Sequence, residues 1–246
     1  MVSEVSKNKI KWLRSLRLKK NRDDEGLFIL EGEKMVLEAI EQRPDLIHTV
    51  IAEKNHLLSS IPASAELFFA GKDQLEQISE LKTPNKLIAV LKKPEFSSIP
   101  SGGLRLVLCD IQDPGNMGTI LRIADWFGIS EIICSKGTVD CYNEKVLQAC
   151  MGSILRVPVR YTDLSDFLSR QTEDIYAADL QGENIYKSTD LRPGLIMMGN
   201  EGRGIPKDLE HFISRKLFIP RVGGAESLNV AVATGIILSE FRRQQS

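Results

Sequence analysis

Three loops in the second half of the chain combine glycine with asparagine, glutamate, serine and arginine, residue types that can hold a ligand and orient a reacting hydroxyl group. Loop one is 113–118 (DPGNMG), loop two is 199–204 (GNEGRG) and loop three is 224–230 (GAESLNV). Each follows a short apolar run, and ligands bind at the carboxyl ends of strands in open α/β sheets. The three loops therefore predict one composite binding site.

Several common chemistries are not expected, because these loops lack the residues for them. Loop one has neither the GxGxxG spacing of a dinucleotide fingerprint nor the GK[ST] ending of a P-loop. His48, His56 and His211 stand outside the loops, and the four cysteines form no CxxC pair. Histidine acid–base catalysis and a metal site are therefore not expected. The pattern predicts a reaction that depends on positioning more than on proton transfer.

Loop one offers two candidate side chains. Asn116 stands where it could cap the helix expected at 116–127, and Arg122 follows it by six residues. The structural alternative is a capped turn with a surface arginine. Taken alone, loop one does not decide between these interpretations.

Loops two and three offer three more candidates. Glu201 stands among three glycines that permit positive φ and close backbone approach, a composition that favours a functional role. Ser227 is expected to cap the last helix, at 227–243, and capping could be its whole role. Asn229 then falls in the first turn of that helix, where asparagine is disfavoured unless it has a partner.

The elements that must position these loops alternate between strand and helix from Leu104 onward. Strands are expected near 104–109, 131–134, 157–161, 174–178, 195–199 and 216–219. Helices are expected near 116–127, 143–151, 163–170, 206–213 and 227–243. This alternation predicts a parallel sheet with helices on both faces.

The first part of the chain predicts a smaller α/β module. A basic amphipathic helix is expected over 3–22, a strand over 27–30 and a helix over 33–41. Apolar runs at 46–52, 66–69 and 87–91 alternate with helical stretches at 53–59 and 72–81. We place this domain at 1–92, a linker rich in proline, serine and glycine at 93–103, and the second domain at 104–246.

The composition is that of a globular protein, with 42% hydrophobic residues, 26% charged residues and a net charge of −1. Positive charge is concentrated in residues 1–22, which contain eight basic residues and a single acidic residue, Glu4. Cys109 and Cys134 fall in apolar runs and are expected to be small core residues. A reduced, cytoplasmic protein without a membrane segment is the expectation.

Together the three loops resemble the motifs of the SpoU (TrmH) family of RNA ribose 2′-O-methyltransferases, in the SPOUT superfamily. The first motif is LVLCDIQDPGNMGTILRIADWFG (106–128), and the second and third are MMGNEGRGIP (197–206) and IPRVGGAESLNVAVA (219–233). The connecting segment KVLQACMGSILRVPV (145–159) is also similar to that family. FILEGEKMVLEAI (28–40) resembles a ribosomal-protein-like module that binds RNA substrates.

The resemblance implies an α/β domain with a deep trefoil knot, bound S-adenosyl-L-methionine and a homodimer. It implies that catalytic or RNA-facing positions are Asn116, Arg122, Glu201, Ser227 and Asn229. It implies cofactor contacts at Leu180, Gly199, Asn200, Gly204, Ile219 and Leu228. Contacts to RNA phosphates are expected from the basic residues Lys7, Lys11, Arg14, Lys19, Lys20 and Arg22.

The leading hypothesis is therefore an enzyme that methylates a ribose 2′-hydroxyl, in ribosomal RNA rather than transfer RNA. Methylation of transfer RNA is one alternative. The other is a catalytically silent RNA-binding or ribosome-assembly protein, against which the intact loop residues argue.

Overall fold

The computed structural model describes residues 3–54, 61–79, 81, 83–96 and 102–245. The chain divides into two compact units. Unit one comprises residues 1–95 with 142–155, and unit two comprises residues 96–141 with 156–246.

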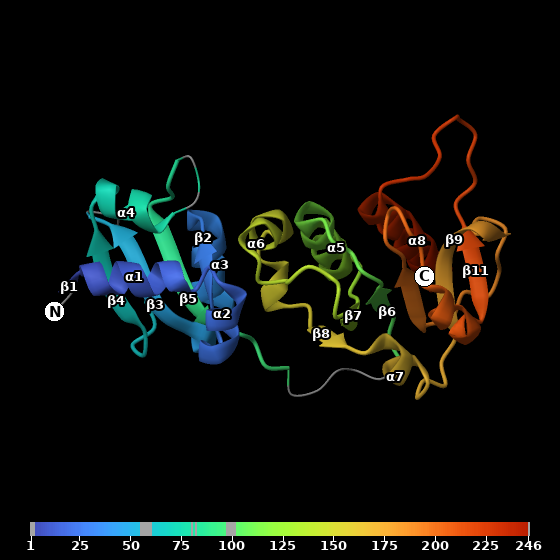
Figure 1. The fold of residues 1–246 in the computed structure, drawn as a ribbon, viewed down its shortest axis with the longest axis horizontal. Coiled ribbons are helices and arrows are strands. Elements are labelled where there is room, and N and C mark those ends of the chain that lie inside the picture. Colours follow the sequence, from blue (N-terminus) through green and yellow to red (C-terminus); the bar gives the residue numbers. More distant parts are fainter. Residues whose placement is uncertain (1–2, 55–60, 80, 82, 97–101, 246) are drawn as a thin grey trace. The chain divides into compact units, whose positions relative to one another are not determined.

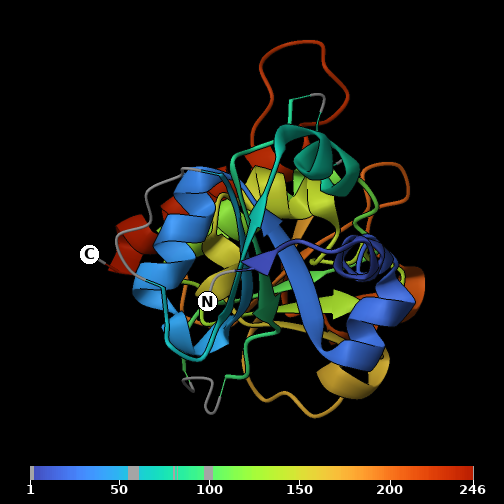
Figure 2. The ribbon, with the colours of Figure 1, turned by 90° about the vertical axis from the view of Figure 1, so that its left-hand side faces the viewer.

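Unit one is built on a mixed sheet with the strand order β1-β4-β3-β5-β2, in which β5 is antiparallel to both of its neighbours. Its strands are β1 (Ser3–Glu4), β2 (Leu27–Glu31), β3 (Ile47–Glu53), β4 (Glu66–Ala70) and β5 (Leu87–Lys92). Its helices are α1 (Lys7–Ser15), α2 (Lys19–Glu25), α3 (Glu33–Gln42), α4 (Lys72–Ile78) and α6 (Glu144–Cys150), with 3₁₀ turns η1 (Pro44–Leu46) and η2 (Ser153–Leu155). Apolar residues of α1 and α4 form a core with one face of the sheet. Figure 2 shows α1 and α3 on opposite sides of this sheet.

The single helix expected over 3–22 is wrong, because this segment forms β1, α1 and the start of α2. The Ser6 side chain caps α1 by accepting a hydrogen bond from the Lys9 N–H at 3.2 Å. Leu18 then has extended backbone, with φ −78° and ψ 127°, and separates the two helices. The buried Arg22 guanidinium donates to the carbonyls of Leu16 (3.0 Å) and Arg17. These bonds satisfy carbonyl groups that the break in the helix leaves without intrahelical partners.

Two other expectations for unit one need correction or fall outside the described residues. The helix expected at 53–59 is wrong at Glu53, which ends β3, and residues 55–59 lie outside the described residues. The helix expected at 72–81 ends at Ile78. The strands expected at 27–30, 46–52, 66–69 and 87–91 and the helix expected at 33–41 are confirmed to within two residues at each end.

Unit two contains the predicted parallel sheet. All of its pairings are parallel, in the order β11-β9-β10-β6-β7-β8. The strands are β6 (Arg105–Leu108), β7 (Glu131–Ser135), β8 (Val159–Thr162), β9 (Ile175–Asn184), β10 (Leu195–Met198) and β11 (Arg215–Phe218). The helices are α5 (Pro114–Trp126), α7 (Leu164–Leu168) and α8 (Val230–Gln245) (Figure 1). The segment expected as a helix at 206–213 is the 3₁₀ helix η3 (Lys207–Phe212).

Helices cover both faces of this sheet, as predicted. Leu164 and Leu168 of α7 and Leu209 of η3 share one core cluster with Val107, Ala177 and other strand residues. On the other face Tyr176 of β9 packs edge-to-face on Phe241 of α8, with ring centroids 4.9 Å apart. Because Tyr176 and Ala177 are consecutive in a strand, their side chains point to opposite faces.

Strand β9 contains an excursion that sequence reading did not anticipate. Its pairing with β11 runs to Ala177, opposite Lys216, and resumes at Glu183, opposite Leu217. Residues 178–182 therefore leave the ladder, and a β-carbon on Gly182 would clash with the Lys216 carbonyl group. The excursion begins at the predicted end of the strand and carries Leu180 outward.

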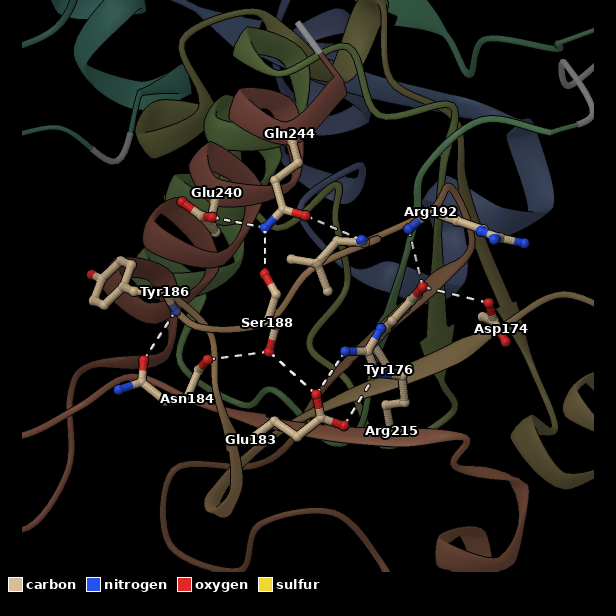
Figure 3. Close-up of polar contacts among 11 residues, drawn as sticks. Asp174, Tyr176, Glu183, Asn184, Tyr186, Ser188, Arg192, Arg215, Glu240 and Gln244 are labelled. Carbon is tan, nitrogen blue, oxygen red and sulfur yellow. Dashed lines mark hydrogen bonds and ion pairs between the residues drawn. The ribbon is translucent and has the colours of Figure 1, made fainter.

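Hydrogen bonds fix the C-terminal end of α8 to the rest of unit two (Figure 3). Gln244 Nε2 donates to the Ser188 carbonyl group at 2.9 Å, and Gln244 Oε1 accepts from the Leu191 N–H at 3.2 Å. Ser188 Oγ donates to Glu183 Oε2, which also accepts from Arg215 Nη2 at 2.6 Å. The end of α8 is thereby tied to both β9 and β11.

The four cysteines are buried thiols, and Cys109 and Cys134 are confirmed as core residues. Burial raises the pKa of the Cys109 thiol to about 12. Since the thiolate is the reactive form, this thiol is inert at neutral pH. Within the described residues, no helix is both long enough and apolar enough to span a membrane.

Candidate active site

The N-terminus of α5 forms one wall of the candidate site. Asp113, not Asn116, caps this helix: Asp113 Oδ1 accepts from the Asn116 N–H at 2.8 Å. Pro114 occupies the first helical position, where its missing N–H costs nothing. The expectation that Asn116 is the cap is therefore wrong. The reason is that the Asp-Pro pair starts the helix earlier, which leaves the Asn116 side chain available for other contacts.

Three side chains, one from each loop, form a continuous hydrogen-bonded row. Asn116 Nδ2 donates to Glu201 Oε1 at 2.6 Å, and Asn229 Nδ2 donates to Asn116 Oδ1 at 2.8 Å. These residues are 85 and 113 positions apart in sequence. The composite site predicted from the loops thus has a physical centre, with Asn116 in the middle.

Asn229 also begins α8. Its Oδ1 accepts from the N–H groups of Ala231 (2.9 Å) and Val232 (3.3 Å), which is the pattern of an N-cap. The expectation that Ser227 caps this helix is wrong, because α8 starts at Val230 and Ser227 lies exposed before it. Asn229 is therefore a cap that also reaches Asn116, which explains an asparagine at this position.

Two helix N-termini meet at this row of side chains. Asn116 is the third residue of α5, and Asn229 directly precedes α8. The N-terminal end of a helix carries the equivalent of about half a positive charge. Both helices therefore favour the Glu201 carboxylate and any negative charge that develops on a bound hydroxyl group.

Loop two is a closed backbone turn. Asn200 and Gly204 exchange two backbone hydrogen bonds, at 3.0 and 2.8 Å. Gly204 has φ +70°, and a β-carbon on Gly199 would meet the backbone of Gly204 and Ile205 at 2.5 to 2.8 Å. The geometry of this turn explains why glycine stands at positions 199 and 204. Asn200 is one of the two residues that close this turn, and its side chain forms hydrogen bonds with other residues of the protein.

Arg122 lies on α5 beyond the row of three side chains. Its side chain is exposed, and in the part of the chain that the structure describes it has no ion-pair or hydrogen-bond partner. Four residues further along the same helix Trp126 is 85% exposed. The exposed side chains of Arg122 and Trp126 lie on one helix, and this surface is accessible to RNA or to another protein chain.

The residues expected to contact the cofactor come from separate loops. Leu180 at the tip of the β9 excursion is 71% exposed, Leu228 is 48% exposed, and Ile219 after β11 is half-buried. β-carbons on Gly223 and Gly224 would meet no atom within 4 Å, so the backbone there is open to a ligand. Exposed apolar side chains and accessible backbone are both features that suit a flat apolar group such as adenine. These features fit S-adenosylmethionine.

The basic residues of unit one differ in their environments. Lys7, Lys11 and Arg14 are exposed and recur at the i, i+4 and i+7 spacing of one helix face. Lys20 is also exposed, whereas Lys19 pairs with Asp23 at 2.5 Å. Arg22 is buried and, as described above, bonds backbone carbonyls. The exposed face of α1 is thus the continuous part of the expected basic surface.

Sequence reasoning missed two aspartates that build this site. Asp113 caps α5, and its signal was the proline that follows it. Asp110 has φ +53° at the end of β6 and bonds loop two through its carbonyl group. No local sequence pattern marks Asp110, because its partners are Ser135 and Asn200, far away in the chain.

Comparisons with known proteins identify the family of this chain. The SpoU rRNA methylase family matches residues 103–239, and the MRM3-like substrate binding domain matches residues 7–89. The 23S rRNA (guanosine(2553)-2′-O)-methyltransferase RlmP of Bacillus subtilis is 30% identical over 244 residues, which cover 97% of this chain and 98% of that protein.

Solved structures give the same result. A TrmH-family protein from Porphyromonas gingivalis is 37% identical with a TM-score of 0.88, and the match covers 98% of this chain and 100% of that one. The AdoMet-bound rRNA methyltransferase from Sinorhizobium meliloti is 29% identical with a TM-score of 0.87, covering 100% and 98%. The chain therefore belongs to the SpoU rRNA methylase family and carries an MRM3-like substrate-binding domain ahead of the methylase domain.

Proposed function

We propose that this protein methylates a ribose 2′-hydroxyl group in ribosomal RNA with S-adenosylmethionine as methyl donor. The observation that carries the proposal is the hydrogen-bonded row Glu201–Asn116–Asn229, which joins all three family motifs at two helix N-termini. Family membership and the AdoMet-bound relative support the cofactor and the reaction.

In this mechanism Asn116 and Asn229 orient the hydroxyl group. Each amide Nδ2 carries two hydrogens and uses one within the row, so each keeps one donor for the ribose. Glu201 uses Oε1 within the row, which leaves Oε2 to accept the hydroxyl proton as the new O–C bond forms. Ser227 is exposed in loop three, and its side-chain hydroxyl group provides a further contact to the ribose hydroxyl group. When bound, S-adenosylmethionine would supply an electrophilic methyl group with a neutral thioether as the leaving group.

Arg122 holds the RNA instead of accepting the proton. A guanidinium group stays protonated in proteins and is therefore a poor base. It can bind a phosphate bidentately and stabilise negative charge on the attacking oxygen. Its exposed position without a partner among the described residues supports this role.

S-Adenosylmethionine is assigned to the loops at the carboxyl ends of β9, β10 and β11. Leu180, Ile219 and Leu228 would cover its adenine, and the backbone at Gly199 and Gly204 would line the pocket. The exposed apolar side chains described above support this assignment.

A trefoil knot is part of the proposal. The chain leaves β10 in the middle of the sheet and forms β11 outside β9. It must then return past β9 and β10 to bring Asn229 to Asn116 on α5. A long segment joins β11 to α8 (Figure 1), and in this proposal the threaded part of the chain lies after β11.

We also propose a homodimer through α5 and α8. A groove of about 390 Å³ is lined by apolar and small residues of both helices, including Ile123, Val232 and Gly235, and by Tyr186. Trp126 stands exposed near this surface on α5. Exposed apolar surface of this kind is typical of an interface, and a two-fold dimer would place the same face of both copies together.

Unit one supplies RNA binding through the exposed α1 face, and the reaction takes place in the cytoplasm. The match to an MRM3-like substrate binding domain supports the first assignment, and four free cysteines fit a reducing compartment. The division into domains at 1–92 and 104–246 remains a prediction.

If α1 contacts phosphates, the variant Lys7→Ala/Lys11→Ala/Arg14→Ala should bind RNA more weakly and with less salt dependence. Each lost phosphate contact lowers the slope of log K against log salt by about 0.7 on single-stranded RNA, so a change of about 2 is expected. Titration of a ribosomal RNA fragment at several salt concentrations measures this slope. The matched control carries alanine at Lys34, Lys54 and Lys86. An equal change in the salt slope for this control would contradict RNA binding by the α1 face.

The test of the function is a nucleotide-resolution map of 2′-O-methyl groups in total RNA from cells with and without the gene. One ribosomal RNA site should disappear in the deletion and return with the wild-type gene. Loss of a transfer-RNA site would support that alternative substrate. An unchanged map, together with no affinity for S-adenosylmethionine, would support the silent RNA-binding protein.

A further inference from the structure

An aspartate with unusual backbone geometry lies two residues beyond the central strand β6. Asp110 has φ +53°, in the left-handed region that most L-residues avoid and that aspartate and asparagine enter most readily. It stands directly before the segment that leads to loop one, so the direction of its carbonyl group depends on this conformation.

Neighbouring side chains hold Asp110 in place. Its N–H donates to Ser135 Oγ at 2.9 Å, and Ser135 Oγ donates to Asp110 Oδ1 at 2.6 Å. Gly137 leaves room for this carboxylate, because a β-carbon there would clash with Asp110 Oδ1. The strand β7 and the turn after it thus fix the end of β6.

The Asp110 carbonyl group is the anchor of loop two. It accepts from Asn200 Nδ2 at 2.8 Å, while Asn200 Oδ1 accepts from the N–H groups of Gly202 (3.0 Å) and Arg203 (3.1 Å). Both polar atoms of the Asn200 side chain are therefore used within the protein. Glu201 lies between these bonds, and its backbone cannot shift without breaking one of them.

We propose that Asp110 and Asn200 are positioning residues for methyl transfer, acting as a brace that sets Glu201 against Asn116. The brace transmits the position of β6 to loop two, and the result is the 2.6 Å bond between Glu201 and Asn116. This assigns Asn200 a role in orienting the catalytic row instead of the cofactor contact expected from sequence. The inference rests on the proposed function.

The substitution Asn200→Asp removes the hydrogen bond to the Asp110 carbonyl group and keeps the bonds to loop two. One aspartate oxygen still accepts from Gly202 and Arg203, but the other replaces the donor and faces the Asp110 carbonyl group. We expect kcat to fall about 100-fold, as for a displacement of roughly 1 Å at a reacting group. The KM for RNA and the Kd for S-adenosylmethionine should stay within about threefold of wild type, because the Asn200 side chain bonds Asp110, Gly202 and Arg203 and the backbone turn that is assigned to the cofactor keeps its own hydrogen bonds.

Asn184→Asp is the matched control. Asn184 forms the same kind of turn, with its Oδ1 accepting from the Tyr186 N–H at 3.0 Å, and it belongs to none of the three loops. Its kcat should be unchanged. Asn200→Ser serves as a second variant if Asn200→Asp does not fold: serine can accept from Gly202 but is too short to reach Asp110. It should show the same loss of kcat.

A crystal structure of Asn200→Asp gives a readout that does not depend on activity. The distance from Glu201 Oε1 to Asn116 Nδ2 should exceed about 3.5 Å, beyond a hydrogen bond. An unchanged distance overturns the brace, as does unchanged kcat with weakened S-adenosylmethionine binding, which would make Asn200 a cofactor ligand. If wild-type protein transfers no methyl group, the proposed function fails, and the distance still decides the brace.

Discussion

Replacing Asn116 with alanine is expected to lower methyl transfer by about 10²- to 10³-fold with the fold intact. Asn116 is the middle member of the row, so its removal breaks the bonds to both Glu201 and Asn229. It also removes the free amide hydrogen that would orient the ribose hydroxyl. Loss of alignment alone costs about 100-fold per ångström of displacement, and the lost contact adds to it.

The fold should survive because Asn116 does not cap its helix. Asp113 performs that function through the backbone N–H of residue 116, which alanine retains. Turnover of ribosomal RNA with radiolabelled S-adenosylmethionine measures the effect, and thermal unfolding checks the fold. Gln148→Ala is the matched control, an amide on α6 that bonds Glu144 four residues earlier. Turnover within about threefold of wild type would remove Asn116 from the mechanism.

The sheet of unit two could be predicted because its signals are local. Most of the strands contain a short apolar run, and a glycine, a proline or a helix start follows within a few residues. Cys109 and Cys134 were placed in the core for the same reason. The three loops were brought to one site by the rule that parallel strands end at the same edge of the sheet.

The details that sequence missed depend on which of several local options the tertiary structure selects. Ser227 and Asn229 are both good caps, and Asn229 caps α8 because that side chain also reaches Asn116. The basic N-terminal stretch has helical periodicity throughout, yet it breaks at Leu18. The sequence predicts that Arg22 is an exposed charge. It is buried because the break in the helix leaves carbonyl groups that its guanidinium can bind.

The sequence predicts Asn116, Glu201 and Asn229 as separate candidates, and the structure adds their order. The amide in the centre donates to the carboxylate and accepts from the second amide, so its flip state is fixed by its neighbours. This fixed orientation is what a reaction based on alignment requires. Arg122 has no such partner among the described residues, and it therefore needs a separate explanation.

If the proposed homodimer forms, the geometry of α5 favours a role for Arg122 in the active site of the partner subunit. Six residues of helix correspond to a rotation of about 240° and a rise of about 9 Å, so Arg122 and Asn116 project from different faces. Asn116 already points to Glu201 of its own chain. The exposed groove along α5 and α8 is where a second copy is proposed to bind.

Arg122→Ala is expected to lower turnover by about 100-fold or more, and Arg122→Lys by about tenfold. Lysine keeps the charge but cannot form two parallel hydrogen bonds to a phosphate. Arg170→Lys, an exposed arginine after α7, is the matched control and should turn over normally. Full turnover by Arg122→Lys would contradict bidentate holding of the RNA.

Mixed dimers of Arg122→Ala and Asn116→Ala chains decide which subunit Arg122 serves. The two chains are co-expressed with different tags and purified through both. If Arg122 acts across a two-fold dimer, one of the two sites has both residues intact, and about half of wild-type turnover should return. If it acts in its own subunit, each site lacks one residue, so the mixed dimer should be as inactive as its parents. If no mixed dimer is recovered, the proposed homodimer is wrong and Arg122 must act within its own chain.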